Sequence, residues 1–106
     1  MKKSYKIETY LPIEALDNIK NALYKLGVGK IGNYENCMSW YPITSSWKPI
    51  DGAQPYLGNV GEIEFAPEYK LEFRCEENMI EEAIQTIKDN HPYEEVGINI
   101  IEILVY

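Results

Sequence analysis

The sequence predicts a single α+β domain whose elements follow in the order strand, helix, strand, strand, helix, strand. Three observations predict this class. Two segments have the apolar spacing of amphipathic helices, and other segments alternate as strands do. The length of 106 residues is near the commonest size of one domain. We therefore expect residues 1–106 to form one unit around one core.

The first strand and the first helix are predicted by a change of apolar period. Residues 5–11 alternate between apolar and polar, which is typical of a strand with one buried face. From Ile13 to Leu26 apolar residues recur every three to four positions, which predicts a helix with one stripe toward the core. Pro12 favours the start of this helix and Gly27 favours its end.

The middle of the chain is less regular. A second strand is expected near Tyr34–Tyr41, with Thr44–Lys48 as an extension or a second pairing segment. Residues 42–67 have no helical period and are rich in proline, glycine and aromatic residues. Such long irregular loops are uncommon in a compact domain unless they serve a function. The third strand is predicted at 68–74, where aromatic and aliphatic residues alternate with charged ones.

The second helix is predicted at about Glu77–Asn90. Its first half is acidic and Lys88 lies near its end, which suits the helix dipole. The segment Ile98–Val105 is almost entirely apolar. A continuous apolar run is typical of a strand covered on both faces, so we expect the last strand to be central in the sheet.

This element order is the split β-α-β arrangement of ferredoxin-like domains. Right-handed crossovers then place both helices on one face of a four-stranded antiparallel sheet. The other face, which carries Glu8 and Tyr10, is left bare in a monomer. A bare apolar face predicts an oligomer or a ligand.

Composition argues against several classes of partner. The net charge is -7 and Arg74 is the only arginine, whereas nucleic-acid binding needs clustered basic residues. Neither helix has a basic face for a membrane surface, and no apolar run approaches the roughly 20 residues that span a bilayer. The start of the chain lacks a signal-peptide core, so a cytoplasmic location is expected. In that compartment Cys37 and Cys75 are expected to be buried thiols rather than a disulfide.

Three local motifs occur in order along the chain. They are GKIGNY at 29–34, GAQPYLG at 52–58 with VGE at 60–62 after it, and HPYEE at 91–95. As a set they resemble the domain inserted in YqfO-type proteins, the bacterial members of the NGG-interacting-factor-like family. The same domain also occurs alone in short bacterial proteins. The last motif is similar to the one that precedes the final strand of CutA proteins. The resemblance covers roughly Tyr5–Leu104.

The resemblance implies a PII/CutA-like fold for the whole of residues 1–106. It also implies self-association, with a trimer expected by analogy and a dimer as the alternative. It implies no activity, because the metal site of full-length YqfO-type proteins needs several histidines in flanking domains, whereas this chain has one histidine. Val96 departs from the motif, which usually continues with proline.

The second and third motifs supply the candidate ligand-binding residues. These are Gly52, Gln54, Pro55, Gly58, His91, Tyr93, Glu94 and Glu95. His91 and Glu94 are candidate ligands of a divalent cation, since imidazole and carboxylate groups both bind metals. In the alternative interpretation, which we favour, the turn is structural. His91 would then satisfy carbonyl groups at the end of the second helix, beyond which Pro92 prevents continuation.

Four aromatic residues bracket the loop at 52–61. They are Trp40, Tyr41, Trp47 and Tyr56. Such residues either seal the core and subunit contacts, which we favour, or line an apolar pocket.

No catalytic site is predicted. The single histidine has no serine or cysteine partner signalled by spacing. Glu94 and Glu95 are adjacent, so their side chains point to opposite faces of an extended chain. The glycine-rich loop lacks the G-x-x-x-x-G-K pattern of a phosphate site. We therefore expect a non-enzymatic oligomeric binding or regulatory module that responds to a small ligand or a divalent cation. A purely structural or partner-binding protein is the alternative.

Overall fold

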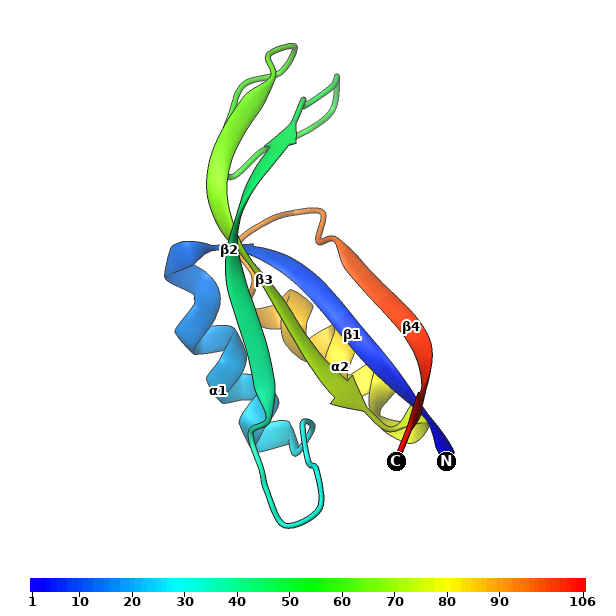
Figure 1. The fold of residues 1–106 in the computed structure, drawn as a ribbon. Helices are drawn as coiled ribbons and strands as arrows, with labels where there is room; N and C mark the ends of the chain where they lie inside the picture. Colours follow the sequence, from blue (N-terminus) through cyan, green and yellow to red (C-terminus); the bar gives the residue numbers. More distant parts are fainter.

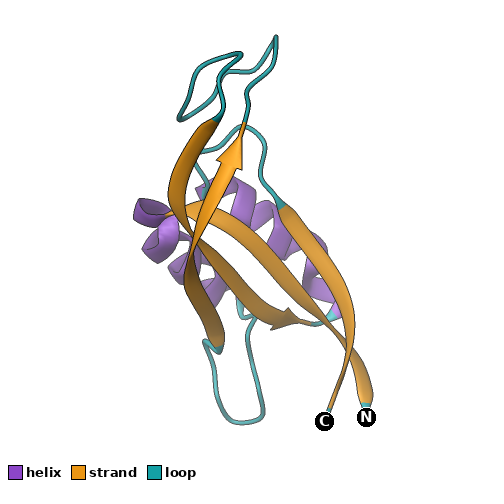
Figure 2. Cartoon of the chain, turned by 45° about the horizontal axis from the view of Figure 1, so that its top comes forward, coloured by secondary structure: helices purple, strands orange, loops and turns teal.

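The computed structural model describes all residues 1–106 and confirms the predicted ferredoxin-like fold class. Its elements are β1 (Lys2–Pro12), η1 (Ile13–Ala15), α1 (Leu16–Leu26), β2 (Met38–Trp47), β3 (Glu64–Cys75), η2 (Glu77–Met79), α2 (Ile80–Asn90) and β4 (Ile98–Val105). The four strands form one antiparallel sheet in the order β2-β3-β1-β4. Both helices lie on one face of this sheet (Figures 1 and 2). Neither helix is long and apolar enough to cross a membrane.

The core lies between the helices and the sheet. β1 is central, so that Ile7 faces Phe73 on one side and Ile100 on the other. The buried apolar cluster consists of Ile7, Leu11, Ala15, Leu16, Ile19, Leu23, Val28, Leu71, Phe73, Cys75, Ala83 and Ile87. Full burial of one leucine or isoleucine contributes about 1.5–3 kcal/mol. The buried side chains of β1 and of α1 therefore pack against each other in one apolar layer, as the apolar spacing of both segments predicts.

The two helices end by different means. α1 ends at Gly27, which adopts the left-handed conformation and donates its N–H to the carbonyl groups of Leu23 and Tyr24. α2 ends at His91, whose backbone is extended with φ -104° and ψ 133°. A residue before proline is pushed away from the helical region, and Pro92 follows His91 directly. This extended conformation turns the chain out of the helix at the start of the HPYEE motif.

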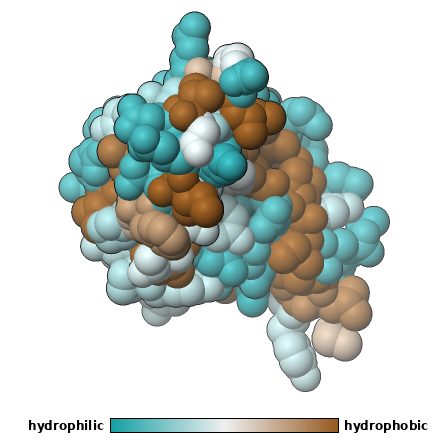
Figure 3. All heavy atoms as spheres, turned by 90° about the horizontal axis from the view of Figure 1, so that it is seen from above, coloured by the Kyte–Doolittle hydropathy of each residue, from teal (hydrophilic) through white to brown (hydrophobic).

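The prediction that the last strand is central is wrong. β4 is an edge strand that pairs with β1 alone. Ile101 is 39% exposed and Leu104 is 67% exposed, on opposite faces of the strand. Figure 3 shows apolar atoms gathered on the side of the molecule where β4 lies in Figure 1. An apolar run indicates that burial of both faces of a strand is favourable. It does not determine the position of the strand in the sheet, which follows from the connections between the elements.

The second strand lies later in the chain than predicted. β2 begins at Met38, and the extension expected at Thr44–Lys48 continues it without a break as far as Trp47. Residues 29–37 instead form a loop before the strand, with a bridge between Ile31 and Tyr34, and Cys37 closes the loop by donating its N–H to the carbonyl oxygen of Gly29 at 2.8 Å. A Cβ at Gly29 would lie 3.0 Å from the Cys37 carbonyl oxygen, so only glycine fits this approach. Cys37 is therefore half-buried outside the strand, and both cysteines are free thiols.

Strands β2 and β3 continue beyond the helices as a two-stranded arm (Figure 1). The outermost pair is Trp47 with Glu64, and the loop at 48–63 joins the two strands. The loop folds back on itself, since Gly61 donates its N–H to the carbonyl oxygen of Pro49 at 2.8 Å. This arm gives the molecule an extent of 47 Å along one axis and about half that along the others, 24 and 22 Å.

The face of the sheet opposite the helices carries a charge network on its central strands. Glu8 is 6% exposed and lies 3.2 Å from the ammonium group of Lys6 and 3.3 Å from that of Lys70. Burial alone would raise the pKa of Glu8, but the hydrogen bonds from Lys6, Asn99 and Lys70 lower it overall. A buried carboxylate of this kind is tolerated because its charge is paired.

Candidate functional site

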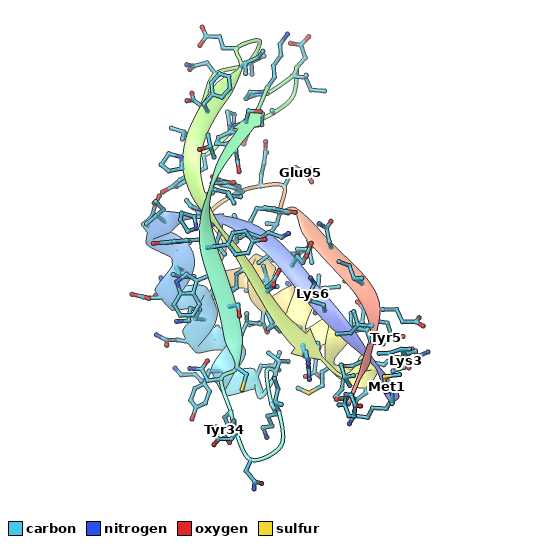
Figure 4. All side chains as sticks on the ribbon, in the orientation of Figure 1. Met1, Lys3, Tyr5, Lys6, Tyr34 and Glu95 are labelled. Carbon is cyan, nitrogen blue, oxygen red and sulfur yellow. The ribbon has the colours of Figure 1, made fainter.

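The structure brings the second and third sequence motifs together. The backbone N–H of Gln54 donates to the Glu94 carboxylate at 2.7 Å, although the two residues are 40 positions apart. The ring of Tyr56 lies 5.6 Å from the ring of Tyr93. The loop at 48–63 and the HPYEE turn are therefore in direct contact. Figure 4 labels Glu95 on this turn, at the end of the molecule from which the arm projects.

A cleft of about 480 Å³ lies between the arm and the turn. Its lining residues are Tyr10, Ser45, Ser46, Trp47, Lys48, Pro49, Ile50, Ala53, Pro55, Tyr56, Leu57, Glu68, Tyr93, Glu94, Glu95 and Gly97. Of the predicted ligand-binding residues, Pro55, Tyr93, Glu94 and Glu95 line this cleft.

The other predicted ligand-binding residues lie next to the cleft without lining it. Gln54 contributes the backbone hydrogen bond to Glu94. Gly52 and Gly58 turn the loop, with φ values of 95° and 108°. The His91 ring packs against the ring of Tyr93, with 4.7 Å between the ring centroids and an angle of 59° between the ring planes. These four residues therefore support the residues that line the cleft and are not exposed in the cleft themselves.

Three aromatic rings form the apolar part of the cleft. Trp47 and Tyr56 lie 6.0 Å and 5.6 Å from Tyr93, with the ring planes tilted. The indole N–H of Trp47 donates to the Leu57 carbonyl oxygen at 3.1 Å, and the Tyr56 hydroxyl donates to Glu14 at 2.6 Å. The polar end of each of these two side chains is therefore bonded outside the aromatic cluster, which leaves their rings to pack.

Of the four aromatic residues that bracket the loop, only Trp47 and Tyr56 line this cleft. Trp40 lies elsewhere on the sheet, with the Lys20 ammonium group 3.6 Å from its ring centroid. Tyr41 lies near Lys70, whose ammonium group is 5.7 Å from the tyrosine ring. The pocket interpretation thus describes Trp47 and Tyr56, while Trp40 and Tyr41 serve contacts on the sheet.

His91 is buried and both of its ring nitrogens are engaged. The N–H of Tyr93 donates to Nδ1 at 3.1 Å, so Nδ1 is an acceptor. Nε2 lies 2.8 Å from the carbonyl oxygen of Tyr10, which requires a proton on Nε2. The ring is therefore neutral, and burial lowers its pKa. The carbonyl belongs to β1 rather than to the end of α2 as expected, because the extended His91 directs its side chain toward β1.

No group of three or more histidine, cysteine, aspartate or glutamate side chains gathers where it could hold a metal ion. The two predicted metal ligands already have other partners in the chain. His91 bonds Tyr10 and Tyr93, and the Glu94 carboxylate bonds the N–H of Gln54. A divalent cation at His91 would have to displace one of the two bonds of the ring, and the metal site stays a prediction.

Glu68 is a candidate site residue that the sequence pattern does not reveal. It lies on the alternating charged face of β3, which predicts an exposed side chain. In the structure it lines the cleft, is only 3% exposed and accepts a 2.5 Å hydrogen bond from the Tyr93 hydroxyl. Burial raises the pKa of Tyr93, and this hydrogen bond raises it further. The hydroxyl therefore remains a donor to Glu68 at neutral pH.

Sequence comparison matches the chain to a set of longer bacterial proteins named GTP cyclohydrolase 1 type 2 homolog. The Staphylococcus epidermidis protein is 40% identical over 90 residues, which is 85% of this chain and 25% of that protein. The Bacillus subtilis protein is 37% identical over 95 residues, or 90% of this chain and 26% of that protein. The chain thus spans about a quarter of the length of the curated relatives it matches. No protein-family model matches the chain.

Structure comparison matches the chain to a NIF3-related protein and to two shorter proteins. A Bacillus cereus protein related to NIF3 superposes with a TM-score of 0.84 at 24% identity, covering 96% of this chain and 26% of that one. The resemblance to YqfO-type, NIF3-related proteins is confirmed. The divalent ion tolerance protein CutA1 from Ehrlichia chaffeensis has a TM-score of 0.70 at 22% identity, over 100% and 86% of the two chains. Bacillus subtilis GlnK has 0.63 at 16% identity, over 96% and 86%. These last two similarities confirm the fold.

Proposed function

We propose that this NIF3-related chain is a non-enzymatic binding module whose ligand site is the cleft between the β2–β3 arm and the HPYEE turn. One observation carries the proposal. Two motifs 40 residues apart meet through the Gln54–Glu94 hydrogen bond and enclose an aromatic cleft of about 480 Å³. Ligand pockets have volumes of about 300–1,000 Å³, apolar walls and a few placed polar groups. The cleft has all three properties.

The groups around the cleft favour binding over catalysis. The lining contains carboxylates, tyrosines, two serines and one lysine, but no histidine that could activate a nucleophile. Neither cysteine lines it, and burial raises the pKa of the Cys75 thiol to about 11. The enzyme name of the curated relatives describes proteins about four times as long as the matched segment. We therefore assign no reaction to this chain.

We further propose that the chain self-associates through the open face of the sheet and the β4 edge. β4 leaves one row of backbone N–H and C=O groups unpaired, and its apolar side chains are exposed on both faces. A second copy would cover both features. The resemblance to CutA and PII proteins favours a trimer, and a dimer is the alternative.

The ligand site is tested by an NMR screen with aromatic fragments in equal numbers of cationic, neutral and anionic compounds. We expect perturbed amide signals to concentrate at the cleft, together with the indole signal of Trp47. The variant Ala53→Trp fills the cleft and should abolish these shifts. Val60→Trp, on the same loop but outside the cleft, should not. If no fragment of any charge perturbs the cleft, the turn and loop serve folding alone and the binding proposal fails.

Self-association is tested by light scattering at tens of micromolar. We expect a mass of two or three chains for the wild type. Ile101→Lys places a charge on β4 and should shift the mass to that of one chain. The control Ile63→Lys changes an exposed residue of the 48–63 loop and should leave the mass unchanged. A wild-type mass of one chain would rule out this part of the proposal.

A further inference from the structure

Glu68 is a buried carboxylate without a cationic partner. It is 3% exposed, and its one hydrogen bond comes from the neutral hydroxyl of Tyr93. None of the ion pairs of the chain includes it. Glu8 provides the contrast, since it is 6% exposed but lies within 3.3 Å of the ammonium groups of Lys6 and Lys70. A buried charge is costly unless it is paired, and Glu68 faces the cleft rather than a partner in the chain.

The rest of the cleft has the same electrostatic character. Glu94 and Glu95 also line it, and Lys48 is its only cationic side chain. The faces of aromatic rings attract cations, and three such rings meet here. Carboxylates and ring faces both repel a phosphate or carboxylate group. The lining is therefore matched to a positive charge on a body large enough to contact the rings.

We infer that the cleft takes a small organic cation, with an ammonium or guanidinium group directed toward Glu68 and an apolar or aromatic body against Trp47, Tyr56 and Tyr93. This inference rests on the proposed function of the cleft as a ligand site. A hard divalent cation fits less well, because such ions need six or more oxygen ligands and the Tyr93 hydroxyl already bonds one oxygen of Glu68. A cleft of about 480 Å³ also exceeds what a bare ion fills.

Three probes that differ mainly in charge test this inference: 2-phenylethylammonium, 2-phenylethanol and 3-phenylpropionate. Each is titrated into the full chain at neutral pH, and binding is followed by the NMR signals of the cleft. We expect the ammonium compound to bind at least ten-fold more tightly than the alcohol, and the carboxylate to bind most weakly. Added salt should weaken the ammonium compound more than the alcohol.

Two variants assign the preference to Glu68 and the rings. Glu68→Gln keeps the size of the side chain and an oxygen to accept from Tyr93, but removes the charge. It should bring the ammonium compound to the affinity of the alcohol and leave the alcohol unchanged. Glu81→Gln, exposed on α2, is the matched control and should change neither. Trp47→Leu keeps Glu68 and should weaken the ammonium compound several-fold, which gives a second test if Glu68→Gln does not fold.

The outcomes separate this inference from the proposed function. If the alcohol or the carboxylate binds the cleft as tightly as the ammonium compound, the cleft remains a ligand site but the cation inference is overturned. A preference for the ammonium compound that survives in Glu68→Gln, or binding of that compound outside the cleft, also overturns it. Failure of all three probes overturns it as well, while the fragment screen decides separately whether the cleft binds any ligand.

Discussion

Replacing His91 by alanine tests whether the HPYEE turn is held by its histidine. The ring donates to the Tyr10 carbonyl oxygen at 2.8 Å and accepts from the Tyr93 N–H at 3.1 Å. Each hydrogen bond contributes about 0.5–1.5 kcal/mol, and both of its partners would lose their bonds in the variant. We expect a loss of about 2 kcal/mol. For a domain of this size that corresponds to a fall in melting temperature of roughly 10 °C.

The assay is thermal unfolding followed by circular dichroism, with a chelator present and then with added Zn²⁺. With chelator, His91→Ala should melt well below the wild type. Zn²⁺ should leave the wild-type melting temperature unchanged, because both nitrogens of the ring are already bonded. Two further variants keep the ring intact: Glu94→Gln changes the other predicted metal ligand, and Glu35→Gln changes a carboxylate before β2.

Two results would refute this reasoning. A melting temperature within 1–2 °C of the wild type would mean that the hydrogen bonds of His91 contribute little. If instead Zn²⁺ raises the wild-type melting temperature by mass action, and this gain disappears in His91→Ala and weakens in Glu94→Gln but not in Glu35→Gln, His91 is a metal ligand. The gain should then fade below about pH 6, where protonated imidazole stops coordinating.

Three more predictions concern pH, a tight turn and the core. Burial lowers the pKa of His91, so its contribution to stability is full above about pH 6.5 and is lost as the pH falls from there toward the lowered value. Denaturant titrations should show this slope in the wild type, and a similar slope in His91→Ala would contradict the assignment. Gly29→Ala should cost about 1–3 kcal/mol, because a Cβ at φ 77° meets a carbonyl oxygen at 3.0 Å. Chemical denaturation checks this, and a neutral result would show that the turn adjusts freely. Leu71→Ala should cost about 2–5 kcal/mol in the same assay, whereas the exposed Ile63→Ala should stay within about 0.5 kcal/mol, and equal costs would contradict the described core.

The sequence predicts the fold correctly in those segments where the spacing of apolar residues alone distinguishes a strand from a helix. The alternation before Pro12 and the stripe after it define β1 and α1, and the charged alternation at 68–74 defines the inner part of β3. The place of β4 could not be predicted in the same way. The apolar run at 98–105 indicates only that burial of the strand is favourable. Its position at the edge of the sheet follows from the path of the whole chain.

The candidate site was predicted only in part because it is made by tertiary contacts. The motifs indicated Tyr93, Glu94 and Pro55, all of which line the cleft. Trp47 was ambiguous, since an aromatic residue packs in a core and in a pocket alike. Glu68 gave no signal, because its alternation with apolar residues is that of an exposed side chain. Only the return of the HPYEE turn over β3 buries it beneath Tyr93.

The two-stranded arm divides the molecule into parts of unequal local stability. β1 is packed under both helices, whereas the pairs from Thr44–Pro67 to Trp47–Glu64 project beyond them (Figure 1). Phe65 in this arm is already 65% exposed, so the amide protons of the arm should exchange with solvent far sooner than those of β1. The arm and the loop at its tip contact the rest of the chain through Tyr93, Glu94 and Glu14. If the cleft is the proposed ligand site, a molecule that contacts both Trp47 and Tyr93 should hold the arm closed and slow amide exchange along both of its strands.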